Sequence, residues 1–245
     1  ATVDFHHLGF GIGHVAFLGS AFIKPAVKCT QLVHRHRTPD AGLPILVNGQ
    51  TSFGIRGGYS VSSMSYRYSA GRPAVRTGGI SAPTFAFVME HFAGKNAGIQ
   101  IEIQYLTLGY TQTDTLLVGT NQTELNYLKM PVLSNFYAGK GGRFHIKIGP
   151  HFGYLLNATD VQRDFEGPLF LPTYGTPEDN PRKFMYGLTA GAGLSKLFGK
   201  STLEADLRFS YEFGRPETLD RIFDMNSTNL EFTLAYLFRV KERKE

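Results

Sequence analysis

Residues 201–213 alternate strictly between apolar and polar side chains. The segment reads STLEADLRFSYEF, and every second residue from Leu203 to Phe213 is apolar, while the residues between them are polar and mostly charged. Successive side chains of a β-strand point to opposite faces. The pattern therefore predicts one long strand whose apolar face can lie against hydrocarbon and whose other face carries charge.

Seven further segments show the same period of two. Two of them are strong, residues 143–154 and 229–240, and the weaker ones are residues 52–64, 84–93, 99–110, 126–137 and 186–198. Most of the eight are longer than the five or six residues of a usual globular strand. The sequence therefore predicts an all-β chain of eight strands.

The connections between these segments alternate in length. Three are short and contain the dipeptide Gly-Lys, which begins at Gly94, Gly139 and Gly199. Glycine supplies the positive φ of a tight hairpin. The other connections are long and polar, at residues 65–81, 111–124, 157–183 and 214–226. This alternation is typical of an antiparallel up-and-down transmembrane β-barrel that has long loops on one side and both chain ends on the turn side.

A soluble barrel with its apolar face turned inward is the alternative, and the glycines argue against it. They lie on the polar faces of the strands, at Gly54, Gly58, Gly149, Gly153, Gly187, Gly191 and Gly193. In a narrow membrane barrel the polar face is a crowded interior, where glycine makes room for long charged neighbours. Aromatic residues near the strand ends, such as Phe144 and Phe198, fit interfacial girdles, although the chain has no Trp.

Composition removes several other classes of protein. No uninterrupted apolar run reaches the length of about 18 residues that a membrane helix needs. The only cysteine, Cys29, excludes an internal disulfide. The net charge of +5 is spread along the chain rather than clustered, so we expect no nucleic-acid partner.

The polar faces carry six basic and six acidic residues that we assign to a lumen network of ion pairs. They are Arg56, Lys129, Arg143, Lys147, Arg208 and Arg239 with Glu90, Glu102, Glu204, Asp206, Glu212 and Glu231. An eight-stranded barrel is only just wide enough for side chains to fill. Buried charges are tolerated when they are paired. The sequence therefore predicts a plug rather than a pore.

Four motifs in order resemble the PorT-like outer-membrane β-barrels of Bacteroidota. They are YLKMP at residues 127–131, GPHFGY at 149–154, the spaced glycines of 187–193 and ADLRFSY at 205–211. The resemblance covers residues 51–238 and implies an eight-stranded barrel in the bacterial outer membrane. In such a barrel, the alternation of long and short connections predicts periplasmic termini. Many members have no known catalytic activity. Some similar proteins serve type IX secretion or gliding machinery, and others belong to different outer-membrane assemblies.

Residues 1–50 precede the barrel, which we assign to residues 51–240, and a basic tail follows at 241–245. We expect the first segment to be periplasmic, where it caps the lumen or binds a partner; the alternative is two more strands and a ten-stranded barrel. Its histidines are His6, His7, His14, His34 and His36. Their spacing matches no recognised metal site, so we expect loop histidines and neither metal nor cofactor.

A catalytic site would need a nucleophile, a base and an orienting group close together. His145 and His151 lie on the lumen side of one predicted strand, about 20 Å apart at the usual rise, and cannot act on one bond together. Ser60, Ser62 and Ser210 also face inward, but no Ser, His and acid triplet is evident. We therefore expect no enzyme.

The leading hypothesis is a non-enzymatic accessory or scaffold subunit of a larger envelope complex, in contact with outer-membrane lipid and other envelope proteins. The candidate partner-binding loop carries Phe165, Leu169, Phe170 and Leu171; alternatively, this loop packs over its own barrel mouth. A narrow channel or small-ligand transporter is the second hypothesis, and a lipid enzyme active at the rim is the third. The turn lysines either meet anionic headgroups or simply solubilise the turns.

Overall fold

The computed structural model describes residues 49–67, 71, 75–114, 119–164, 181–213 and 224–241. The predicted N-terminal segment and the candidate loop at 165–171 lie outside these residues. The barrel strands are β1 (Gln50–Arg67), β3 (Ile80–Phe92), β4 (Ala97–Asp114), β5 (Gly119–Gly139), β6 (Gly142–Arg163), β7 (Phe184–Phe198), β8 (Ser201–Glu212) and β9 (Asp224–Lys241). Strand β2 (Val75–Arg76) is a two-residue addition that pairs with β1.

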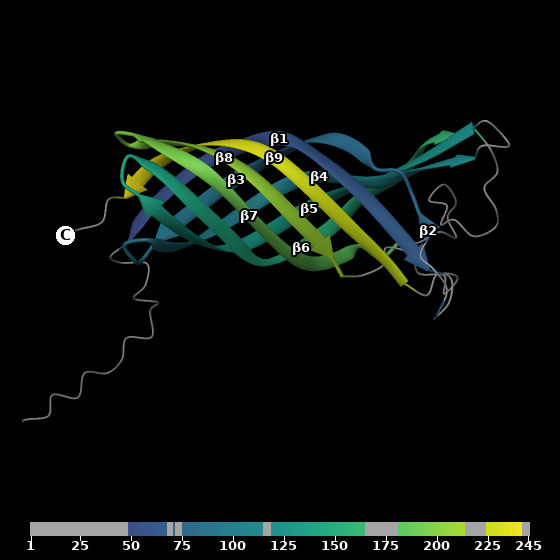
Figure 1. Cartoon of the computed structure of the whole chain (residues 1–245), viewed down its shortest axis with the longest axis horizontal. Helices are drawn as coiled ribbons and strands as arrows, with labels where there is room; N and C mark the ends of the chain where they lie inside the picture. Colours follow the sequence, from purple (N-terminus) through teal and green to yellow (C-terminus); the bar gives the residue numbers. More distant parts are fainter. Residues whose placement is uncertain are drawn as a thin grey trace, which may run out of the picture. The chain divides into compact units, whose positions relative to one another are not determined.

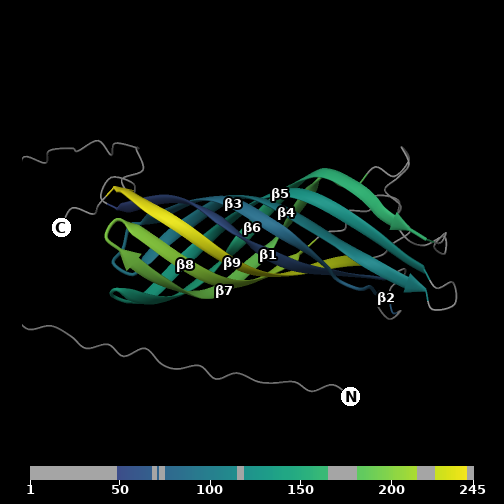
Figure 2. The same ribbon diagram turned by 90° about the horizontal axis from the view of Figure 1, so that it is seen from above.

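The eight long strands form a closed antiparallel ring (Figures 1 and 2). Each strand pairs with its neighbour in the chain, and β1 closes the ring by pairing with β9 from Thr51↔Lys241 to Arg67↔Asp224. The prediction of an eight-stranded up-and-down barrel is confirmed. The ten-stranded alternative is wrong, because the direct pairing of β1 with β9 leaves no place for two more strands.

The three short connections are tight turns at one end of the barrel, called the turn end below. Gly139 and Gly199 adopt positive φ values of 113° and 62°, a region that residues with a side chain rarely enter. Gly94 turns the chain between β3 and β4 and is not among the positive-φ glycines of the described residues. Strand β1 begins and β9 ends at this same end.

The outer face of the barrel is apolar. Ile55, Phe87 and Phe209 point outward and are 60%, 72% and 49% exposed. Charged residues of the same strands point inward, so the arrangement suits a hydrocarbon exterior and not a soluble barrel with an apolar lumen. Among the described residues, no helix is long and apolar enough to cross a bilayer.

The two faces exchange character near the other end of the barrel, called the loop end. In β4 the apolar residues from Ile99 to Tyr105 face outward, but Leu106 and the next apolar residues face inward. Strand β5 makes the same change between Tyr127 and Leu128. The strands therefore leave the hydrocarbon here and continue as a wall with an apolar interior, reaching furthest in β4, β5 and β6 (Figure 2).

This exchange explains why several strands are longer than predicted. Strands β4 and β5 run to Asp114 and from Gly119, so the loop expected at residues 111–124 is shorter than predicted. Strand β6 runs to Arg163, well past the expected end at Tyr154. A search for one continuous alternation stops where the phase changes, although the backbone pairing continues.

Candidate functional site

Nine charged side chains from six strands fill the middle of the lumen and form what we call the charge belt. None is more than 3% exposed. The members are Arg56, Glu102, Lys129, Lys147, Glu204, Asp206, Arg208, Glu212 and Glu231. All nine belong to the twelve residues that the sequence assigned to the lumen, and four cations face five carboxylates.

The strongest contact of the belt joins Arg208 on β8 to Glu102 on β4. Arg208 Nη1 and Nη2 donate to the two carboxylate oxygens over 2.8 and 2.7 Å, which is a bidentate pair. Arg56 on β1 lies 3.2 Å from the same carboxylate through its Nε. The pairing therefore links three strands across the lumen rather than along the wall.

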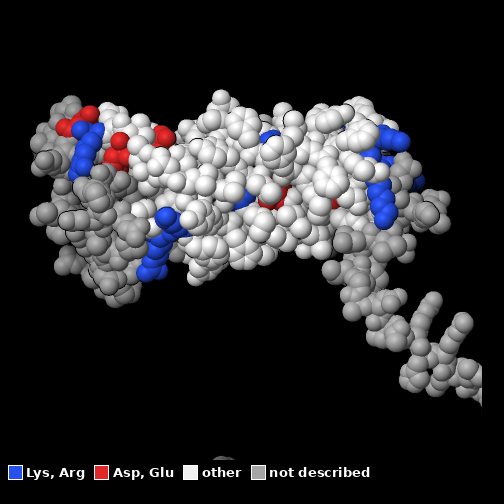
Figure 3. Space-filling model, turned by 180° about the vertical axis from the view of Figure 1, so that it is seen from behind, with Lys and Arg blue, Asp and Glu red and all other residues white. Residues whose placement is uncertain are grey.

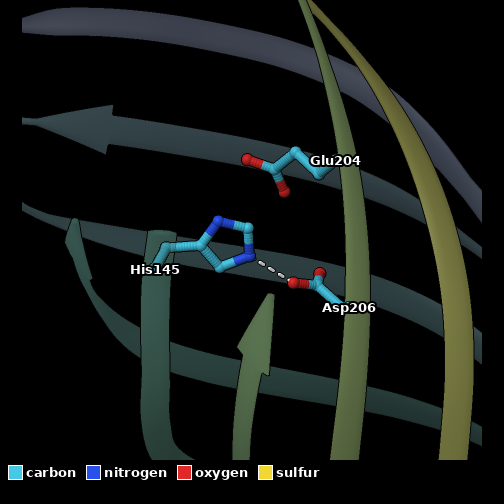
Figure 4. A group of neighbouring side chains, drawn as sticks. All are labelled: His145, Glu204 and Asp206. Atoms are coloured by element: carbon cyan, nitrogen blue, oxygen red, sulfur yellow. Dashed lines mark hydrogen bonds and ion pairs between the residues drawn. The ribbon is translucent and has the colours of Figure 1, made fainter. Parts of the chain in front are cut away.

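Arg56 and Lys147 neutralise a second pair of carboxylates, nearer the turn end. Lys147 Nζ lies 2.6 Å from Glu204 Oε2 and 3.2 Å from Asp206 Oδ2. Arg56 contacts both carboxylates through its two terminal nitrogens and donates to Thr233 Oγ1 over 3.1 Å. A hydrogen bond also joins His145 Nε2 to Asp206 (Figure 4).

His145, Glu204 and Asp206 present ligand-type atoms within 4.8 Å of one another, which invites a metal interpretation (Figure 4). The sequence did not single out this group, because its members come from two strands. The donor set suits a divalent ion, but the protein's own cations already use the oxygens: Lys147 and Arg56 contact both carboxylates. The geometry is that of an ion-pair cluster.

Glycine makes room for these long side chains, as the sequence pattern indicated. A methyl group at Gly191 on β7 would lie 2.8 Å from Cγ of Arg208. A methyl group at Gly193 would collide with the side chains of Asp206 and His145. These two glycines therefore leave space for the side chains of the belt, because the lumen of an eight-stranded barrel is only just wide enough for side chains.

The part of the belt nearer the loop end is organised around Lys129 and Glu231. Lys129 Nζ donates to Ser210 Oγ over 2.8 Å and lies 3.5 Å from Glu231 Oε1. Gln104 and Asn229 donate to the two oxygens of Glu231 over 2.7 and 2.8 Å. The Glu231 carboxylate therefore has one cation beside it, and neutral amides donate its other hydrogen bonds.

A cluster of buried apolar side chains fills the lumen beyond the belt, toward the loop end, and we call it the apolar plug. Every member is at most 7% exposed. The members are Met64, Tyr66, Leu106, Leu108, Tyr110, Leu125, Tyr127, Leu155, Met185 and Met225. Sequence reasoning missed this plug, although the change of phase at Leu106 was its visible signal.

Three of the predicted lumen residues, Glu90, Arg143 and Arg239, lie outside the belt, at the turn end. Glu90 accepts a hydrogen bond from Asn135 Nδ2 at 2.5 Å. The Arg143 guanidinium lies 4.1 Å from the centre of the Tyr137 ring. Arg239 is half-buried, and its backbone N–H donates to Lys200. Among the described residues, none of the three forms an ion pair, and their assignment to the network is corrected.

A small recess opens at the turn end between Glu90, Arg143, His145 and Glu204. Its volume is about 10 Å³. A cavity needs at least about 10–15 Å³ to hold one water molecule. The recess is therefore not an aqueous vestibule of the kind that would lead solute to the belt.

The lumen also contains a chain of hydroxyl, imidazole and carboxylate groups that sequence reasoning did not identify. His151 Nδ1 and Thr189 Oγ1 are hydrogen-bonded at 2.9 Å, and His151 Nε2 lies 3.6 Å from Glu212 Oε1. The order resembles a nucleophile, base and acid. All three side chains are at most 1% exposed, so no substrate reaches them in this structure.

The comparisons with known proteins agree with this architecture. A family model described as an outer membrane protein beta-barrel domain matches residues 40–215. The chain belongs to this family of outer-membrane β-barrels. Family and fold together make it a protein of the bacterial outer membrane, with its apolar outer face in the lipid.

Solved structures of outer-membrane proteins match this chain at low sequence identity. The outer membrane protein OprG from Pseudomonas aeruginosa gives a TM-score of 0.50 at 9% identity, covering 80% of this chain and 98% of that chain. Ail, the attachment invasion locus protein of Yersinia pestis, gives 0.38 at 11% identity, covering 77% and 99%. A search of the curated proteins finds no match. The likeness to OprG concerns the fold alone.

Proposed function

We propose that this protein is a non-enzymatic outer-membrane barrel that acts as an accessory or scaffold subunit of a multi-protein envelope complex, of the secretion, gliding or outer-membrane assembly type. The proposal includes the kinship with PorT-like barrels of Bacteroidota that its motifs suggest. It also includes periplasmic termini, with residues 1–50 as a separate segment before the barrel of residues 51–240 and the basic tail 241–245.

The observation that carries this proposal is the closure of the lumen by two layers of different chemistry. The charge belt is held by ion pairs such as Arg208 with Glu102. The apolar plug beyond it leaves Leu106 and Leu125 with no exposed surface. A solute would have to break the ion pairs and displace the apolar side chains, so a transport role for the lumen is disfavoured.

A barrel with a filled lumen still offers its loops, its N-terminal segment and its outer wall to other molecules. We assign partner binding to the loop that carries Phe165, Leu169, Phe170 and Leu171, where apolar residues stand between prolines. Residues 1–50 are the second candidate surface. A contact made by these segments leaves the belt and the plug undisturbed, which is consistent with a structural role for the barrel.

Purification from the native envelope tests the scaffold role. The tagged full-length protein, extracted in mild detergent, is expected to bring down at least one partner in a fixed ratio. Replacing the four apolar residues of the candidate loop with Ser should remove that partner. A matched variant, with Leu116 and Leu117 between β4 and β5 replaced by Ser, should keep it. A monodisperse monomer isolated from the native envelope would contradict the proposal.

A further inference from the structure

A groove with a volume of about 580 Å³ runs across the outer wall of the barrel. Two rows of outward side chains border it, and each row follows the hydrogen-bonding direction from strand to strand. The first row consists of Leu203, Tyr236, Ile55, Phe87 and Ile103. The second consists of Leu234, Gly57, Phe85, Tyr105 and Leu128. The volume falls within the range of about 300–1,000 Å³ that is usual for ligand sites.

Gly57 leaves a gap in the second row, and packing does not require a glycine there. A methyl group at Gly57 would meet nothing closer than the Phe85 ring at 3.5 Å. Methyl groups at the neighbouring inward glycines, Gly54 and Gly58, would collide with the backbone of β9. The absence of a side chain at Gly57 therefore widens the groove without serving the close packing of the wall.

The groove crosses the apolar band obliquely, because the strands are tilted (Figure 1). One end lies at Leu203, close to the start of β8 at the turn end. The other lies at Leu128, where β5 changes phase near the loop end. An occupant of the groove therefore lies in the bilayer with one end close to the turn-end interface.

Two lysines stand at the turn end of the groove. Lys196 on β7 is the register partner of Leu203 and therefore continues the first row outward. Its ammonium group lies 5.3 Å from the centre of the Phe198 ring. Lys200 immediately precedes β8. Both lysines are exposed.

The charges around this end have one sign. Among the described residues of the turn end, the carboxylates of Glu90, Glu204 and Asp206 are all buried inside the lumen. On the face drawn in Figure 3, Lys and Arg gather at the turn end, whereas the loop end also shows Asp and Glu. Between the two ends, that face shows only a few small patches of charged atoms.

We propose that the groove and the two lysines bind one anionic phospholipid, with its phosphate at Lys196 and Lys200 and an acyl chain along the groove. Only an amphiphile with a negative head and an apolar tail matches both parts of this surface. A peptide strand laid in the groove would leave its own backbone unsatisfied, because the lining offers almost no polar atoms. The site is independent of the proposed scaffold role.

Native mass spectrometry with added lipid tests the headgroup part. Dioleoylphosphatidylglycerol is expected to bind the purified protein at one site, more tightly than dioleoylphosphatidylcholine. The variant K196Q/K200Q should weaken phosphatidylglycerol binding by about 30-fold, or about fivefold for each lysine, and leave phosphatidylcholine unchanged. The control variant K95Q/K140Q removes the same charge from the other two turns and should change little.

The variant Gly57→Leu tests the acyl part, because its side chain fills the groove without touching the lysines. We expect it to lose the tightly bound phosphatidylglycerol. The control Ala190→Leu adds the same side chain to the outward face of β7, outside the groove, and should retain the lipid. Equal binding of the two lipids by the wild-type protein would overturn the proposal. An equal loss of phosphatidylglycerol binding in K196Q/K200Q and K95Q/K140Q would also overturn it, as would full binding by Gly57→Leu.

Discussion

Arg208 and Glu102 meet face to face across the lumen, through hydrogen bonds of 2.8 and 2.7 Å, from strands that are not neighbours in the ring. Both residues are 1% exposed. This contact ties opposite walls together at the level of the charge belt. It makes the belt both a structural brace and a barrier to solutes.

Removing one partner of this contact should strongly destabilise the barrel. In Glu102→Ala, Arg208 and Arg56 lose a carboxylate that both of them contact. Leaving a buried charge uncompensated typically costs about 3–5 kcal/mol. Urea unfolding in lipid vesicles, followed by the mobility of folded and unfolded forms on gels, measures the change in the free energy of unfolding.

The double variant E102M/R208M supplies the control for that loss. Because both charges leave together, much of the stability should return, although Arg56 still lacks one partner. Glu124→Ala removes a carboxylate from the outer face of β5 and should cost less than about 0.5 kcal/mol. If Glu102→Ala were as stable as Glu124→Ala, the belt would not brace the barrel.

The apolar plug should contribute stability as the core of a soluble protein does. Leu106 has no exposed surface, and Leu106→Ala should lower the free energy of unfolding by about 2–5 kcal/mol through lost burial and a cavity. Ile103→Ala truncates a neighbouring residue that faces lipid and is half exposed, so its cost should be smaller. The same unfolding assay compares them. Equal costs would argue against a packed plug.

The turn between β5 and β6 requires glycine at position 139 but not at position 141. Gly139 has a φ of 113°, and a methyl group there would also collide with the carbonyl oxygen of Gly142, so Gly139→Ala should cost at least about 1–2 kcal/mol in strain. A methyl group at Gly141, in the same turn, would meet no atom within 4 Å, and Gly141→Ala should be close to neutral. The difference between the two variants in urea midpoint measures the strain; identical midpoints would contradict it.

The phase change in the strands predicts where the hydrocarbon ends. Ile148 faces outward in the apolar band, and Ile148→Arg should cost about 2–4 kcal/mol, the usual penalty near the bilayer midplane. Gln122 faces outward on β5 beyond the phase change, and Gln122→Arg should cost at most about 1 kcal/mol. Unfolding of both variants from vesicles gives the comparison. A large penalty at Gln122 would place the boundary further toward the loop end.

The period of two was sufficient to predict the eight strands, because each strand separates two environments of opposite polarity. The same rule missed the ends of β4, β5 and β6, where the lumen becomes apolar and the alternation reverses. Tyr105 and Leu106 are adjacent apolar residues at that reversal in β4. In a barrel, two adjacent apolar residues of this kind mark the point where the strand leaves the hydrocarbon, and the strand itself continues.

Which charged residues contact one another in the belt was harder to predict than the presence of charge in the lumen. Which inward residues share one level depends on the stagger between strands, and one strand's sequence does not contain that stagger. Arg143 and His145 are adjacent inward positions on β6, yet only His145 reaches Asp206. The cross-lumen pairing of Arg208 with Glu102 likewise depends on the closed ring. The sequence therefore predicted a charged lumen and not its contacts.

Single-channel recording in planar bilayers tests the central claim most directly, which is that the belt and the plug close the lumen. Purified monomer, with its insertion verified by protease protection, is expected to give no steady conductance steps, because the side chains that form both layers are almost completely buried. Steady, reproducible steps from the wild-type monomer would contradict the closed lumen and favour a narrow channel.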